Sequence, residues 1–116
     1  MDEHSSITIV KTSLTVAASG TMYSIPIDLA KHIGYFSVQI TVSGSGTLSL
    51  AYELSNHVTD PLTFSTPVGA SAIATGLTAG TYLYEFTPVI GKWLRLVFTE
   101  TGTSDSVTIV SRLAGQ

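Results

Sequence analysis

The histidines, carboxylates and serines of this chain could carry chemistry, but none stands in a recognisable catalytic or metal-binding pattern. His4, His32 and His57 lie in separate polar or turn-like stretches, without a spacing that would place two imidazoles on one metal ion. No serine occupies the Gly-x-Ser-x-Gly sequence of a nucleophile elbow. The Gly-Ser-Gly at 44–46 lacks the Lys-Ser/Thr that ends a phosphate-binding loop, so it is interpreted as a turn. The absence of cysteine excludes thiolate nucleophiles, disulfides and cysteine-based zinc sites.

The carboxylates define no acid–base pair. The candidates are Asp28, Glu53, Asp60, Glu85, Glu100 and Asp105. Glu53, Glu85 and Glu100 alternate with core positions or end strands, where we expect solvated side chains. Asp105 lacks the acidic neighbours of a calcium loop. A glycosidase-like pair assembled only by the fold stays open. We predict a protein that is not an enzyme, with no catalytic residue, metal or cofactor.

Few residues are charged, and the chain is rich in small hydroxyl side chains. Charged residues make up 11% of the 116 residues, against roughly 25% in typical domains. There are 17 Thr and 15 Ser. Such a surface loses little rotamer entropy when a partner buries it, although threonine also follows from strand propensity. The net charge of −3 and scattered basic residues predict no nucleic-acid binding.

Targeting signals are not apparent. No apolar run is long enough to cross a bilayer, so we predict no membrane partner. The acidic start at 1–4 is unlike a signal peptide. We expect synthesis in a cytoplasm.

Period-two alternation is the dominant structural signal. Residues 34–42 and 47–54 alternate and are joined by a Gly/Ser turn, which predicts a β-hairpin. Residues 92–100 carry apolar side chains on both faces, which predicts a central strand, and 106–113 resumes the pattern. Residues 5–16 predict one long or two short strands.

Two further stretches complete the expected strands. Residues 23–27 predict a strand at a sheet edge, because Pro26 cannot donate to a ladder. Residues 56–81 predict a long loop with one irregular strand around 71–75, followed by a strand at 82–86.

About eight short strands predict an all-β fold, an antiparallel two-sheet sandwich that is jelly-roll-like. An up-and-down barrel is the main structural alternative. We expect a single domain over 1–116. The segments 1–6 and 111–116 are candidates for flexible or docking ends, and simple fraying is the alternative for both.

Two sets of aromatic and basic residues are candidates for an interface. Tyr82, Tyr84 and Phe86 share one strand face, which could be an interface anchor, a sugar-stacking platform or, as most such stripes are, part of the core. Trp93 lies opposite the apolar face of its strand, and Arg95 shares its face and could hydrogen-bond across a contact.

From Gly34 onward the chain resembles small β-sandwich proteins from the structural gene clusters of tailed phages. The likeness covers roughly the last two-thirds of the chain. It rests on Gly34-Tyr35, Gly46-Thr47-Leu48-Ser49-Leu50, Ser55-Asn56, Tyr82-Leu83-Tyr84-Glu85-Phe86 and Lys92-Trp93-Leu94-Arg95-Leu96-Val97. The chain departs from that pattern at His57, where an acidic residue is expected, and the following Trp is missing, with Leu62 or Phe64 in its place.

The resemblance implies a virion structural protein, by analogy at the level of the fold. We expect a capsid decoration protein that stabilises a phage head, located in the virion, made in the host cytoplasm and homotrimeric. Its other partner would be a phage capsid or tail protein. The alternative is a phage tail or fibre module, or a carbohydrate-binding module. In the latter, Tyr82, Tyr84 or Trp93 would stack on sugar rings. The hydrogen-bonding loop would hold Asn56, His57 and Asp60.

Overall fold

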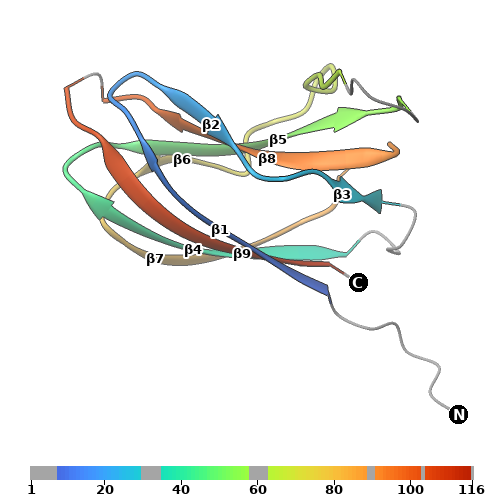
Figure 1. The fold of residues 1–116 in the computed structure, drawn as a ribbon, viewed down its shortest axis with the longest axis horizontal. Helices are drawn as coiled ribbons and strands as arrows, with labels where there is room; N and C mark the ends of the chain where they lie inside the picture. Colours follow the sequence, from blue (N-terminus) through green and yellow to red (C-terminus); the bar gives the residue numbers. More distant parts are fainter. Residues whose placement is uncertain (1–7, 30–34, 58–62, 89–90, 103, 116) are drawn as a thin grey trace, which may run out of the picture.

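Two antiparallel β-sheets pack face to face (Figure 1). The computed structural model describes residues 8–29, 35–57, 63–88, 91–102 and 104–115. The strands are β1 (Thr8–Val16), β2 (Thr21–Tyr23), β3 (Ile27–Asp28), β4 (Phe36–Gly44), β5 (Leu48–Ser55), β6 (Ala74–Leu77), β7 (Gly80–Phe86), β8 (Trp93–Glu100) and β9 (Val107–Gly115). The predicted all-β sandwich is confirmed.

The strand order is that of a jelly roll. Sheet A has the order β1-β9-β4-β7, and sheet B has the order β2-β8-β5-β6, with β3 also pairing with β8. Because β2 and β3 pair with different parts of β8, they act as one interrupted strand. Counted this way, eight strands form the two four-stranded layers of a jelly roll. The two sheets keep free edges, so the barrel alternative is wrong. The predicted β-hairpin of 34–42 and 47–54 is also wrong, because β4 lies in sheet A and β5 in sheet B, and the Gly/Ser turn between them connects the two sheets.

The interruption between β2 and β3 has a local cause at Pro26, which has no N–H to donate to the ladder. Ser24 compensates on the β2 side. Its backbone N–H donates to the Leu96 carbonyl at 3.0 Å, and its Oγ accepts the Leu96 N–H at 2.8 Å. The predicted edge position of this stretch is confirmed, because β2 and β3 flank β8 on its outer side.

Alternating apolar residues from both sheets fill the space between the layers. The fully buried core side chains include Ile40, Leu50, Leu96, Phe98 and Ile109. The predicted central position of 92–100 is confirmed, since β8 lies between β5 and the β2/β3 pair. The core gives each sheet one inner and one outer face.

The C-terminal segment 111–116 was expected as a candidate flexible or docking end, and for 111–115 the expectation of a flexible arm is wrong. These residues lie in β9, where Gly115 is in register with Thr8 of β1 and Phe36 of β4. The buried Leu113 extends the core face of β9, which holds this end in the middle of sheet A. Gln116 and the expected N-terminal arm 1–6 lie outside the described residues.

Two described parts of the stretch 56–81 pair with sheet B. Ser65 exchanges two backbone hydrogen bonds with Leu54, of 3.0 and 2.9 Å. The expected irregular strand is β6, which pairs with β5 through a register shift and lies slightly C-terminal to the predicted 71–75.

Candidate functional site

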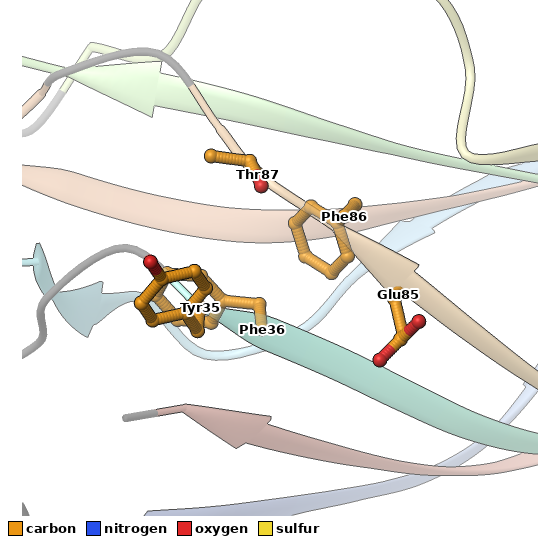
Figure 2. Close-up of a pocket in the computed structure, with 5 residues that line it drawn as sticks. All are labelled: Tyr35, Phe36, Glu85, Phe86 and Thr87. Carbon is orange, nitrogen blue, oxygen red and sulfur yellow. The ribbon is translucent and has the colours of Figure 1, made fainter.

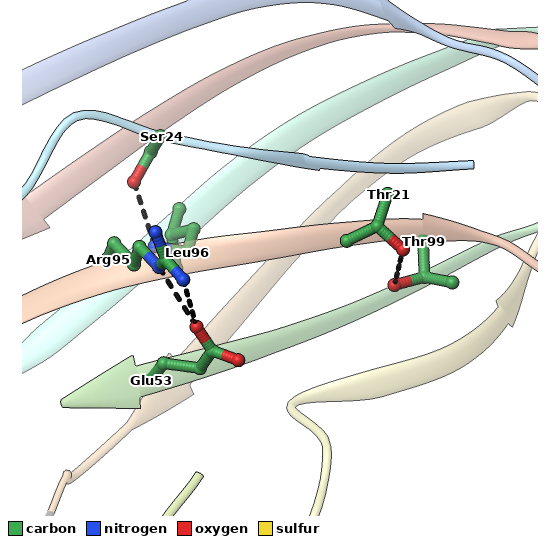
Figure 3. A network of polar contacts seen from close by, with 6 residues as sticks. All are labelled: Thr21, Ser24, Glu53, Arg95, Leu96 and Thr99. Carbon is green, nitrogen blue, oxygen red and sulfur yellow. Dashed lines mark hydrogen bonds and ion pairs between the residues drawn. The ribbon is translucent and has the colours of Figure 1, made fainter. Parts of the chain in front are cut away.

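Arg95, a predicted interface residue, is engaged within the chain on the outer face of sheet B. Its guanidinium lies 3.7 Å from the ring centroid of Tyr23 and 4.4 Å from that of Phe64. Its Nε and Nη2 donate to Oε1 of Glu53 at 2.9 and 2.7 Å (Figure 3). The register of β5 and β8 places Glu53 directly opposite Arg95. Two aromatic rings and one carboxylate therefore enclose this cation.

Trp93 shares the outer face of β8 with Arg95, as predicted, and is half-buried. The Lys92 ammonium lies 5.2 Å from the Trp93 ring centroid. Lys92 also donates to both carboxylate oxygens of Asp28, at 3.1 and 3.0 Å. The buried indole N–H of Trp93 finds no hydrogen-bond partner among the described residues. A partner bound here would meet a preformed cluster rather than free side chains.

The aromatic stripe of β7 shares one face, as predicted, and that face points into the sandwich. Tyr82, Tyr84 and Phe86 are half-buried against the core. The two tyrosine rings have centroids 6.2 Å apart and an interplanar angle of 15°. Phe86 stacks on Phe36 and Tyr52 at 5.6 Å each. The five interface candidates thus fall into two groups, on the inner side of sheet A and the outer side of sheet B.

The expected ligand loop is used in part for structure. The Asn56 side-chain oxygen accepts the Lys92 N–H at 3.1 Å, which ties the end of β5 to the start of β8. The His57 N–H donates to the Ser55 hydroxyl at 3.2 Å. Asp60 lies outside the described residues.

Glu100 was expected to be solvated, and this expectation is wrong. Its side chain is 1% exposed. The carboxylate accepts the N–H groups of Ser19 at 2.9 Å, Thr47 at 2.8 Å and Gly102 at 2.6 Å. A Cβ at Gly102 would lie 2.7 Å from its Oε2, so this position has little room for a larger residue. Glu100 therefore joins three turns at one end of the sandwich.

A shallow hollow lies at the opposite ends of the strands, where β4 begins and β7 ends. Its volume is about 280 Å³, and it is lined by Tyr35, Phe36, Glu85, Phe86 and Thr87 (Figure 2). Tyr35 is 65% exposed, whereas Phe36 is buried at 4%. Sequence reasoning missed this hollow, because only the pairing of β4 with β7 brings Tyr35 near Glu85.

Within the described residues, no group of three His, Asp or Glu side chains could hold a metal ion. The same part of the chain contains no helix able to span a bilayer.

Comparisons with known proteins identify no family. No family model and no curated protein matches the chain. One solved structure with a similar fold is that of the Gx strain of infectious bursal disease virus. The match has 21% sequence identity, covers 94% of this chain and 31% of the viral chain, and has a TM-score of 0.47. This chain thus spans about a third of the viral one, and at this level the likeness carries no conclusion about function.

Proposed function

We propose that this chain is a non-enzymatic structural protein of a virus particle, specifically a decoration protein on the head of a tailed phage. The observation that carries the proposal is the outer face of sheet A, where small hydroxyl side chains predominate over charges. The outward residues are Ile9, Lys11, Ser13 and Thr15 of β1, Thr108, Val110, Arg112 and Ala114 of β9, Ser37, Gln39, Thr41 and Ser43 of β4, and Thr81, Leu83 and Glu85 of β7.

Hydroxyl pairs across the strands already order this face. The Thr15 and Thr108 hydroxyls lie 3.3 Å apart, and those of Thr41 and Thr81 lie 3.1 Å apart. Short side chains that are hydrogen-bonded to each other have little rotamer freedom to lose on binding. A broad sheet face of this kind suits extended contact with another protein better than enclosure of a small substrate.

The fold and the sequence resemblance support the same class of function. Jelly rolls build viral capsid and lectin domains, and this support is analogy at the level of the fold. The resemblance to tailed-phage proteins favours the capsid class. In this role the protein self-associates as a homotrimer and adds buried area at junctions of the shell, so that the shell resists expansion.

The carbohydrate-binding alternative has less support. It requires exposed coplanar rings beside the polar loop, whereas Tyr82 and Tyr84 are half-buried against the core and Asn56 holds the start of β8. The tail or fibre alternative differs from decoration only in where the protein lies on the particle.

Cryo-electron microscopy of particles tests the proposal. Particles of the phage that encodes the chain are compared with particles from which its gene is deleted. We expect density for the jelly roll on the outside of the head of the first particles only, and earlier rupture of the deleted particles on heating. Density on the tail would support the alternative location, and absence from both would contradict a virion role.

A further inference from the structure

The hollow beside β7 has the same residue types as the enclosure that holds Arg95 elsewhere in the chain. Arg95 is held by a tyrosine, a phenylalanine and Glu53. The hollow is lined by Tyr35, Phe86 and Glu85, together with Phe36 and Thr87. Glu85 is exposed, and the ion pairs of the described residues do not include it. We propose that this hollow receives an arginine side chain, and that a second copy of this chain supplies it.

The chemistry of the hollow favours a guanidinium group. The exposed ring of Tyr35 offers a face for cation–π stacking, and the Glu85 carboxylate can accept a forked pair of hydrogen bonds (Figure 2). Phe86 is already stacked on the rings of Phe36 and Tyr52, so it contributes an apolar wall for the aliphatic stem. A volume of about 280 Å³ suits one side chain rather than an extended ligand.

Arg112 is the donor that the chain itself offers. It is the only arginine besides Arg95, and it is exposed on the outer face of β9. Its direct neighbour across the β1–β9 ladder is Lys11, and the repulsion between these two positive charges is unfavourable in the unbound chain. A carboxylate from a partner would relieve this repulsion.

Arg112 and Glu85 belong to the same face of sheet A, but the ion pairs of the described residues do not join them. Arg112 is in register with Gln39 of β4, and Gln39 with Leu83 of β7, two residues before Glu85. Standard strand spacings place their Cα atoms roughly 12 Å apart. Each copy therefore presents one donor and one receptor. Head-to-tail contacts of this kind form a ring when the rotation between copies closes, as a trimer requires, and an open filament when it does not. This inference rests on the self-assembly part of the proposed function.

A titration tests the hollow without reference to any partner. Amide resonances are followed by NMR while Nα-acetyl-L-arginine amide is added to the folded chain. We expect saturable shifts at Tyr35, Glu85 and Thr87, lost in Glu85→Gln and retained in Asp105→Asn, which removes the same charge at another exposed position. Absence of shifts, or shifts from methyl glucoside instead, would overturn the arginine assignment.

Sedimentation velocity tests the second copy as the source. We expect Glu85→Gln and Arg112→Gln each to weaken self-association at least tenfold, and Asp105→Asn to leave it unchanged. The double variant Glu85→Arg/Arg112→Glu exchanges the two charges, which restores the ion pair between copies and should recover association. If both single variants associate as strongly as the wild-type chain, a second copy is not the source of the arginine. A wild-type chain that never associates would instead refute the self-assembly, and the titration would still decide the hollow.

Discussion

The Glu53 carboxylate and the Arg95 guanidinium face each other across β5 and β8, joined at one oxygen by hydrogen bonds of 2.9 and 2.7 Å. With the rings of Tyr23 and Phe64 stacked on the guanidinium, this pair covers part of the outer face of sheet B. Sheet A has no corresponding cover on its described outer face. The two sides of the sandwich are therefore unequal, and the open side is the one we assign to assembly.

Arg95→Lys should cost about 1 kcal/mol of unfolding free energy. Lysine keeps the charge but loses the planar stacking and the forked hydrogen bonds. The side chains of Arg95 and Glu53 are 24% and 19% exposed, so solvent screens part of their attraction. Urea unfolding measures the loss, and Lys11→Arg, on an open surface, is the control. An unchanged midpoint for Arg95→Lys would contradict a structural role for the stack.

Glu100→Gln should destabilise the fold by about 2–4 kcal/mol, because the amide turns one acceptor into a donor facing backbone N–H groups. Thermal and urea unfolding provide the measurement. Asp105→Asn is the matched control, since this carboxylate is exposed and lies outside the proposed contact, and it should stay within about 0.5 kcal/mol of wild type. Equal losses in the two variants would refute the role of Glu100 in joining the turns.

Ser24→Ala should cost about 1–3 kcal/mol, because the Leu96 N–H, now bonded to the serine hydroxyl, would lose its partner inside the sheet. Ser13→Ala on the exposed face of β1 is the control and should be nearly neutral. Hydrogen exchange adds a local readout. The Leu96 amide should exchange faster in Ser24→Ala relative to the other amides of β8. If the Leu96 amide exchanges at the same rate in Ser24→Ala, the Ser24 hydroxyl does not stabilise the break between β2 and β3.

Thr41→Lys should weaken self-association at least tenfold with little change in stability. It places a long charged side chain in the middle of the hydroxyl-rich face, where burial would require its desolvation. Thr75→Lys, at an exposed position of β6 in sheet B, is the matched control. Sedimentation velocity compares the two variants. If Thr75→Lys weakens association and Thr41→Lys does not, the contact lies on the other sheet.

The sequence predicted the sandwich because alternation and turn residues are local signals. The same alternation places Glu100 on the face of Leu96 and Phe98, yet we expected it in solvent. Three turns that are far apart in the sequence meet at the end of β8 and donate to the Glu100 carboxylate. The sequence of a single segment cannot show that these turns come together. The hollow was missed for a related reason, since Tyr35 and Glu85 meet only through the register of β4 and β7.

The mass of the purified chain in solution tests self-assembly most directly. Light scattering over a wide range of protein concentrations should reveal a species of three times 12.2 kDa that becomes dominant as the concentration rises. Retention of a single 12.2 kDa mass up to millimolar concentration would contradict an account based on contacts between copies of this chain.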